Sequence, residues 1–344
     1  MSCMQRKIKL NCVSLVLALN LVVVCEAAEL FYRMQPSTDT NWHTAGNWFT
    51  NDGGDYVLHT DNSGLPGTVD NVVLTGGNNF VPSGQTVTVQ ENTTAVASGG
   101  QFSLGRWGGV DLRINTGAEL TVGGMSVNNS TNNFDPTSTI VNYGTFKSTE
   151  NTYVYDTFNL TNHSGASFTS RGFNVGGTAT ITNSGTMDFR AADGSPDDKW
   201  LYLATDTGNN TWNMNAGTIT ADKIVMSDGG AATLNLDGGL IDADSIAFRV
   251  DPDYIINVGD GRLEVDGDEQ WILNQMKGAG YLRSTQQGHV VSVTYYGTDT
   301  DSSSDYYLKT VVELAAIPES AHVTLVMGLF ALLYLPLSAR KVAI

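Results

Sequence analysis

The sequence predicts an all-β protein built as a right-handed parallel β-helix, and three observations lead to this fold class. Glycine accounts for 37 of the 344 residues and charged residues for only 15%, while asparagine, threonine and serine are frequent. Such a composition favours turns and strands over helices. An Asn/Asp-x-Gly turn recurs along the middle of the chain. Apolar residues alternate on both sides of these turns, which places one face of each short strand inward.

The turns recur at a nearly constant spacing. They begin at Asn115, Asn142, Asn162, Asn183, Asn215, Asp237 and Asn257. The steps between them are 27, 20, 21, 32, 22 and 20 residues, and a period near 21 suits a coil of three short strands. No such unit buries its apolar face alone, whereas stacked units share a core. We therefore expect a β-solenoid over residues 69–263 with roughly nine coils.

The corners of this solenoid call for residues that tolerate a sharp bend. Asparagine and glycine accept a left-handed backbone, and we expect them to do so here. A β-sandwich is the alternative fold, because short strands and turns alone do not separate the two architectures.

Both ends of a solenoid expose a sheet edge and need a cap. We expect residues 29–68 to form the N-terminal cap and residues 264–316 the C-terminal cap. The second cap is predicted as a helix over Asp268–Lys277, ended by Gly278, followed by a hairpin of His289–Tyr296 and Tyr306–Leu314. The helix side chains expected against the last coil are Trp271, Ile272 and Met276.

Residues 1–28 have the three parts of a secretory signal peptide. Arg6, Lys7 and Lys9 precede an apolar run over Leu10–Val24, and small residues follow at Ala27 and Ala28. This order predicts export and cleavage by signal peptidase. The cysteines are Cys3, Cys12 and Cys25. All three lie in the leader, so the mature protein has no disulfide and depends on a continuous core.

Residues 317–344 form a second targeting segment. Pro318, Glu319 and Ser320 precede an apolar stretch over Ala321–Leu337, long enough to cross a bilayer as one helix. A basic pair, Arg340 and Lys341, then follows, and the positive-inside rule keeps it cytoplasmic.

This three-part tail resembles the PEP-CTERM sorting signal of Gram-negative bacteria, with Ser320 where that family has a second proline. The resemblance implies processing by an exosortase near Pro318 and Glu319. An inner-membrane intermediate would then reach the cell surface, the outer envelope or the extracellular matrix. An ordinary tail anchor is the alternative.

The charge of the chain bears on its partners. The formal net charge is −17, and without the two ends 13 basic and 33 acidic side chains remain. Such a surface disfavours a nucleic-acid partner, which needs clustered Lys and Arg. Tryptophan offers a flat apolar face for a sugar ring. The candidates for carbohydrate contact are Trp107, Trp200 and Trp212. Alternating carboxylates suit calcium, for which the weak candidates are Asp299, Asp301 and Asp305; otherwise no cofactor is expected.

Catalysis is the competing interpretation, because polysaccharide lyases and hydrolases also use β-helices. Their chemistry needs carboxylates clustered with Arg, Lys or His. The histidines here are scattered, and stacking of coils brings together at most Arg171 with Asp188 and Arg190. We therefore expect a non-enzymatic structural or adhesive protein, associated with extracellular polysaccharide, and predict no catalytic residue. A carbohydrate-active enzyme or a carbohydrate-binding module on the same scaffold is the alternative.

Overall fold

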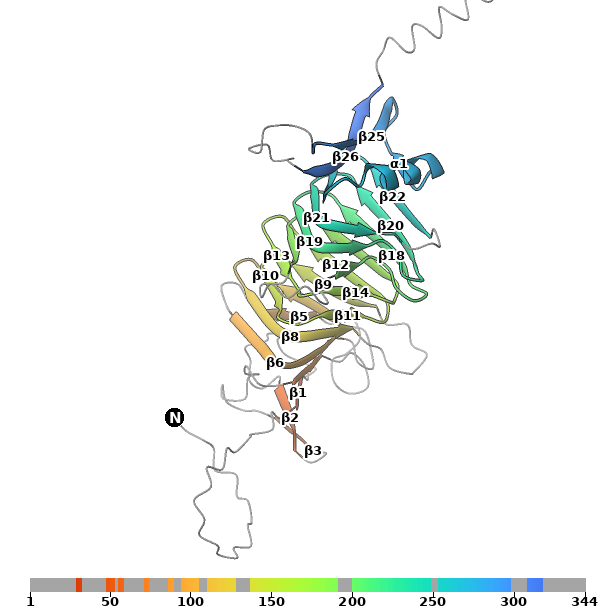
Figure 1. The fold of residues 1–344 in the computed structure, drawn as a ribbon. Helices are drawn as coiled ribbons and strands as arrows, with labels where there is room; N and C mark the ends of the chain where they lie inside the picture. The colour runs from red at the N-terminus through yellow and green to blue at the C-terminus, as the bar shows by residue number, and fades with distance from the viewer. Residues whose placement is uncertain are drawn as a thin grey trace, which may run out of the picture.

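The protein is an all-β parallel solenoid of about seven turns with one short helix (Figure 1). The computed structural model describes residues 110–127, 137–190, 200–248, 253–297 and 308–317, together with the strands β1 to β6 nearer the N-terminus. Strand pairing along the solenoid is parallel and in register, as between Leu160 and Ile181. The prediction of a β-solenoid is confirmed, and the β-sandwich alternative is wrong.

Two sheets run along the molecule. The first sheet contains β5 (Thr86–Val89), β7 (Asp111–Ile114), β9 (Ser138–Asn142), β12 (Phe158–Asn162), β15 (Ala179–Asn183), β18 (Asn209–Met214), β20 (Ala231–Leu236), β22 (Tyr254–Val258) and β24 (Leu282–Ser284). The turns contribute to the second sheet β4 (Asn71–Leu74), β6 (Thr94–Leu104), β8 (Glu119–Val127), β10 (Thr145–Ser148), β11 (Thr152–Val154), β13 (Ser167–Thr169), β14 (Phe173–Val175), β16 (Thr186–Phe189), β17 (Trp200–Tyr202), β19 (Thr218–Val225), β21 (Leu240–Ala247) and β23 (Arg262–Asp266). Each turn supplies one strand to the first sheet and one long or two short strands to the second.

The prediction of nine coils is too high. Two steps of the repeat are 27 and 32 residues long, so these turns use more chain than the period near 21 provides. The residues between 69 and 110 contribute only β4, β5 and β6 to the two sheets.

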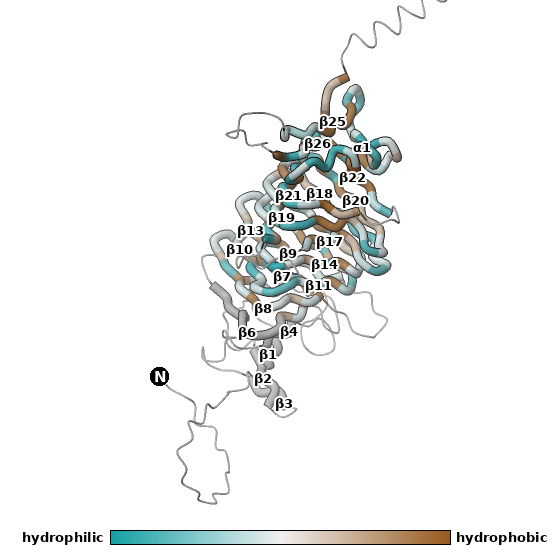
Figure 2. The backbone as a smooth tube through the Cα atoms, viewed as in Figure 1, coloured by the Kyte–Doolittle hydropathy of each residue, from teal (hydrophilic) through white to brown (hydrophobic). Residues whose placement is uncertain are grey.

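The core lies between the two sheets. Inward side chains alternate with outward ones, as the burial of every second residue in β12, β15 and β20 shows. Apolar and polar residues alternate accordingly along the tube in Figure 2. Phe146 and Phe168, from successive turns, stack with ring centroids 4.7 Å apart and an interplanar angle of 11°. Phe173 and Phe189 continue this aromatic column. Because each turn repeats the inward positions, neighbouring turns bury each other's apolar side chains.

The corner asparagines have a different role from the one predicted. Asn142, Asn162 and Asn183 are fully buried and stack as a ladder of side-chain amides. The Nδ2 of Asn142 donates to Oδ1 of Asn162 at 2.9 Å, and Nδ2 of Asn162 donates to Oδ1 of Asn183 at 2.8 Å. In the first and last of these corners, Oδ1 also accepts the N–H of the glycine two residues later. This Asx turn explains the Asn-x-Gly motif without a left-handed asparagine.

The left-handed conformation falls on glycine alone at these corners. Positive φ angles there occur at Gly117, Gly165, Gly217 and Gly239. The prediction that asparagine adopts this backbone is therefore wrong, since none of the described asparagines has a positive φ.

The C-terminal part of the described chain contains α1 (Gln270–Ala279), β25 (His289–Tyr295) and β26 (Lys309–Ala316). β25 and β26 form an antiparallel hairpin, and β26 pairs antiparallel with β23, the last strand of the second sheet in the solenoid. The predicted hairpin is therefore confirmed. The helix begins two residues later than expected and runs through Gly278 to Gly280, which has a φ of +82°.

One of the three helix side chains predicted to face the last coil points elsewhere. Leu273 and Met276 belong to the core, and Ile272 packs against it. Trp271 is 74% exposed. The prediction for Trp271 is wrong because the buried face of the helix passes through Leu273 and Met276, one turn of the helix apart.

Near the N-terminus, β1 (Glu29–Tyr32) pairs antiparallel with β2 (Trp48–Asp52) and parallel with β4. β2 continues into an antiparallel pair with β3 (Asp55–Leu58). The predicted signal peptide (1–28) and the predicted sorting segment from 318 to 344 lie outside the described residues. None of the helices in the described part of the chain has the length and apolar character needed to cross a bilayer.

Candidate functional site

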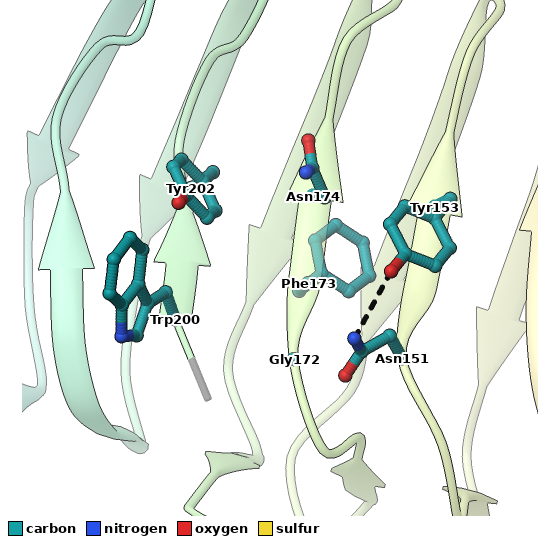
Figure 3. A pocket seen from close by; sticks show the side chains of 7 residues that line it. All are labelled: Asn151, Tyr153, Gly172, Phe173, Asn174, Trp200 and Tyr202. Carbon is teal, nitrogen blue, oxygen red and sulfur yellow. Dashed lines mark hydrogen bonds between the residues drawn. The ribbon is translucent and has the colours of Figure 1, made fainter. Parts of the chain in front are cut away.

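A small hollow opens on the outward face of the second sheet, and Figure 3 shows it from close by. Its volume is about 200 Å³. The residues that line it are Asn151, Tyr153, Gly172, Phe173, Asn174, Trp200 and Tyr202. They come from β11, β14 and β17 or from the residue just before each strand, and thus from three successive turns. The lining contains aromatic rings and amides and has no ionisable acid or base other than the tyrosine hydroxyls.

The register of the solenoid creates the hollow. Tyr153, Asn174 and Tyr202 occupy equivalent outward positions in the three turns. A second row lies two residues earlier and consists of Asn151, Gly172 and Trp200. Adjacent strands are about 4.8 Å apart, so Asn151 and Trp200 stand about 10 Å apart with Gly172 between them. Because Gly172 has no side chain, the middle of this row is open.

Trp200 forms one wall of the hollow and is held from its far side. The Nζ of Lys223 lies 4.1 Å from the centre of the Trp200 ring. Lys223 is the register partner of Trp200 in β19, on the side opposite Gly172. The indole face that Lys223 leaves uncovered therefore borders the hollow. The ring of Tyr202 lies 5.5 Å from that of Trp200, tilted by 43°. A cation over an indole contributes about 0.5–1 kcal/mol at an exposed site, which favours this orientation.

The polar groups of the hollow are arranged by hydrogen bonds. Asn151 donates through Nδ2 to the hydroxyl of Tyr153 at 3.1 Å. Since this hydroxyl accepts a bond, its own proton is left to donate. Asn174 accepts a bond from Oγ1 of Thr205 at 2.9 Å on its Oδ1, which leaves the two N–H groups of Nδ2 as donors. The Oδ1 of Asn151 is buried and has no hydrogen-bond partner within the described structure. The hollow thus offers both donors and an unmet acceptor.

The three tryptophans predicted to contact carbohydrate have different positions. Trp200 is 36% exposed and lines the hollow. Trp212 is 1% exposed, packs edge-on against Phe173 with ring centroids 5.7 Å apart, and donates its Nε1–H to Leu203 O at 3.1 Å. The prediction for Trp212 is therefore wrong, because this side chain belongs to the core. Trp107 lies outside the described residues.

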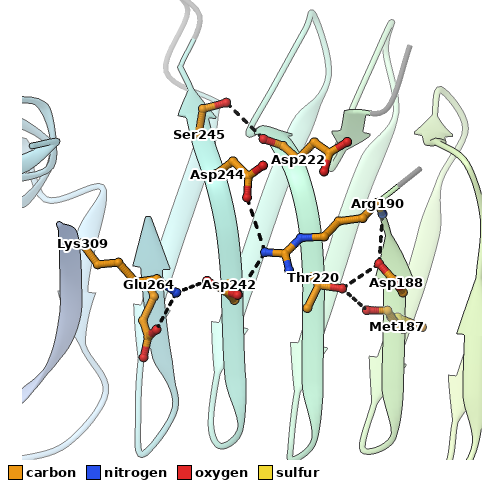
Figure 4. Close-up of polar contacts among 10 residues, drawn as sticks. All are labelled: Met187, Asp188, Arg190, Thr220, Asp222, Asp242, Asp244, Ser245, Glu264 and Lys309. Atoms are coloured by element: carbon orange, nitrogen blue, oxygen red, sulfur yellow. Dashed lines mark hydrogen bonds and ion pairs between the residues drawn. The ribbon is translucent and has the colours of Figure 1, made fainter. Parts of the chain in front are cut away.

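A network of charged side chains crosses the same sheet further along the solenoid (Figure 4). The guanidinium of Arg190 contacts Asp242 at 3.0 Å and Asp244 at 3.4 Å. The Nζ of Lys309, at the start of β26, contacts Oδ1 of Asp242 at 2.6 Å and Oε2 of Glu264 at 3.3 Å. Asp242 thus accepts bonds from two cations and links the solenoid to the hairpin.

The network shifts the pKa values of its members. Partial burial alone would raise the pKa of Asp242, but the hydrogen bonds and charges of Lys309 and Arg190 outweigh burial and lower it. Burial opposes the charge of Lys309 as well, yet the bonds to Asp242 and Glu264 raise its pKa. The pKa of Asp244 is raised, chiefly by partial burial and also by neighbouring acids, against the lowering effect of Arg190. The charged forms of Asp242 and Lys309 therefore stabilise each other.

The residues weighed for catalysis are separated by these contacts. Arg171 pairs with Glu150 at 3.2 Å, one turn away. Asp188 accepts bonds from the backbone N–H of Arg190 at 3.0 Å and from Oγ1 of Thr220 at 2.8 Å. The side chain of Arg190 extends across two turns to Asp242 instead of meeting Arg171. Each of these groups is bonded to a neighbour in the fold, an arrangement typical of structural ion pairs.

A second hollow of about 520 Å³ lies beside the corner turns near the hairpin. Asp260, Arg262, Gln286, His289 and Glu313 are among the residues that line it. Gln286 donates to Oδ1 of Asp260 at 2.6 Å. Among the described residues, no group of three His, Cys, Asp or Glu side chains is placed to hold a metal ion. The calcium candidates Asp299, Asp301 and Asp305 lie outside the described residues.

Comparisons with protein-family models, curated proteins and solved structures find no match for this chain. The chemistry of the two outward features, the aromatic hollow and the charged network, therefore rests on their own geometry.

Proposed function

We propose that this chain is an exported, non-enzymatic β-solenoid that acts as a structural or adhesive component associated with extracellular polysaccharide. The observation that carries this proposal is the hollow between Trp200 and Tyr153, whose aromatic faces and amides suit a sugar ring. The solenoid beneath it is rigid and regular, which suits a spacer that presents a fixed surface.

The charged groups support a structural role more than a catalytic one. Arg190, Asp242 and Lys309 meet across turns distant in sequence, and they bond to one another. General acid–base chemistry needs a group with its proton free to move toward a substrate. Here the paired charges join turns and hairpin, so their geometry favours stabilisation of the fold.

The targeting segments complete the proposal. Signal peptidase would remove residues 1–28, and the helix over 321–337 would hold the chain in the inner membrane until an exosortase cuts near Pro318. The N-terminal strands and the C-terminal helix and hairpin would cap the two ends of the solenoid. Intact mass spectrometry of protein from native cells should give a start near Ala28 or Glu29 and an end close to Pro318. A chain ending at Ile344 would overturn the exosortase step and leave an anchor.

The binding function is tested with the native exopolysaccharide. The purified protein should co-sediment with this polymer, while an assay for reducing or unsaturated sugars on the same mixture should show no steady product. A chelator arm tests whether calcium bridges the acidic surface to an anionic polymer. Steady product release that a single substitution at Asp242 or Arg190 abolishes, without loss of folding, would replace the structural proposal with an enzyme.

A further inference from the structure

We propose that the hollow on the second sheet is a subsite for one uncharged pyranose unit of a neutral polysaccharide. This inference rests on the proposed association with extracellular polysaccharide and names the ligand chemistry and the residues. The wall is Trp200, the floor is the open position at Gly172, and the polar partners are Tyr153, Asn151 and Asn174.

The size and shape of the hollow fit one ring of a longer chain. Its volume of about 200 Å³ is small compared with the pockets of about 300–1,000 Å³ that enclose whole drug-sized ligands. The two rows of outward side chains lie along a regular sheet face, so a polymer has room to continue beyond the ring. The open position at Gly172 lets a ring approach the backbone between Asn151 and Trp200.

The chemistry of the lining matches a neutral sugar. A pyranose has an apolar face of C–H groups, which packs on an aromatic face, and a rim of hydroxyls. The uncovered face of Trp200 provides the platform. The hydroxyl of Tyr153 and the Nδ2 of Asn174 provide donors for hydroxyl oxygens. The unpartnered Oδ1 of Asn151 is an acceptor that a sugar hydroxyl or a bridging water would satisfy.

Charge selects against an acidic sugar at this place. No carboxylate, guanidinium or ammonium lines the hollow, so a uronate would lose water without gaining an ionic partner. The chain as a whole carries a formal charge of −17, which repels an anionic polymer. The nearest cation named above, Lys223, lies over the far face of Trp200 and acts as a positioning residue for the indole.

Affinity electrophoresis of the full chain in native gels tests the subsite, with laminarin and dextran as neutral probes and polygalacturonate as the acidic probe. At least one neutral probe should retard the wild type, with equal retardation in chelator. Trp200→Ala should weaken the binding about tenfold or more, because the platform is lost. Asn174→Ala should weaken it less, by about threefold to tenfold, through one lost hydrogen bond. Trp271→Ala is the matched control, since Trp271 is exposed on α1 outside the hollow, and should bind as the wild type does.

The outcomes separate the subsite from the function. Retardation by polygalacturonate alone, lost with chelator, overturns the neutral-sugar proposal. Wild-type affinity of Trp200→Ala for the native exopolysaccharide overturns the subsite while the proposed function stands. Failure of the wild type to bind native exopolysaccharide overturns the proposed function, and Trp200-dependent binding of laminarin or dextran would still support the subsite. Because Trp200→Ala could perturb folding, Lys223→Met is the second variant. It should lower affinity for the neutral probe by about twofold to fivefold while the thermal midpoint stays near that of the wild type.

Discussion

Replacing the central asparagine of the buried ladder should destabilise the protein far more than the same replacement in an exposed ladder. Asn162 gives hydrogen bonds to Asn183 Oδ1 at 2.8 Å and to Thr186 O at 3.0 Å, and accepts one from Asn142 at 2.9 Å. Asn235 is the matched control. It is the centre of an outward ladder on the first sheet, with one bond donated at 2.8 Å and one accepted at 2.7 Å.

The magnitudes follow from what each substitution leaves behind. Asn162→Ala removes three bonds inside a site with no exposed surface, and each is worth about 1 kcal/mol net. The loss should therefore be about 3 kcal/mol of unfolding free energy. Around Asn235 the ladder is only partly buried, so water replaces the lost bonds, and Asn235→Ala should cost about 0.5–1 kcal/mol.

Urea unfolding followed by far-UV circular dichroism measures both values. The dependence on urea should be unchanged, because the same surface is exposed on unfolding. Stacked repeats sometimes unfold in parts, so hydrogen exchange at the backbone amides of β9, β12 and β15 is the local check. Equal losses for Asn162→Ala and Asn235→Ala would refute the reasoning, since burial would then contribute nothing to the ladder.

Two further predictions concern the hairpin and the turns. Lys309→Met should cost about 1–2 kcal/mol at neutral pH. Because the folded-state pKa of Asp242 is lowered, its contribution is present above its unfolded pKa of about 3.9 and is lost as pH falls through the folded value. The wild type should therefore lose more stability than Lys309→Met in acid titrations, and parallel curves would contradict this. Gly144→Ala should destabilise, since its Cβ would collide with Ala118 O, whereas Gly278→Ala, in open space within α1, should stabilise by about 0.5–1 kcal/mol; melting midpoints that shift in the same direction would contradict the pair.

The period and the alternation of apolar residues were enough to predict the architecture. Both depend on local geometry, because a strand alternates its faces and a repeat stacks on its neighbour. The role of the asparagines depends on contact between turns. An Asn-x-Gly motif fits either a left-handed corner or an amide ladder. The equal steps from Asn142 to Asn162 to Asn183 were the signal for a ladder, since equal steps place identical side chains in register. The ladder ends where the next step is 32 residues and Met214 takes the register position of Asn183 in the following turn.

The candidate site was predictable only in part. In Trp200-Leu201-Tyr202, the central leucine is the inward residue, so alternation alone places both aromatic residues outward. The same rule places Trp212 inward, on the side of Met214. The neighbours of Trp200 across the sheet, Gly172 and Asn151, could not be found this way. Their register depends on how much chain each turn adds before returning to the sheet, and the longest step separates Asn183 from Asn215.

The bend in the second sheet separates the two outward features and gives a last prediction. β16, β19, β21 and β23 carry the charged network, whereas β11, β14 and β17 form the aromatic hollow. Raising the ionic strength from about 0.1 to 1 M shortens the screening length from about 10 to 3 Å. Stacking and neutral hydrogen bonds do not depend on this length, so affinity for a neutral glycan should change by less than about twofold.

The ion pairs of the network should respond in the opposite way. Lys309 and Asp242 attract each other through charge, so the stability difference between the wild type and Lys309→Met should shrink in the same salt series, modestly because the pair is partly buried. Titration of both quantities on one preparation separates the features. A steep fall of glycan affinity with salt would mean that the ligand is held by charge, and the hollow around Trp200 would then not be its site.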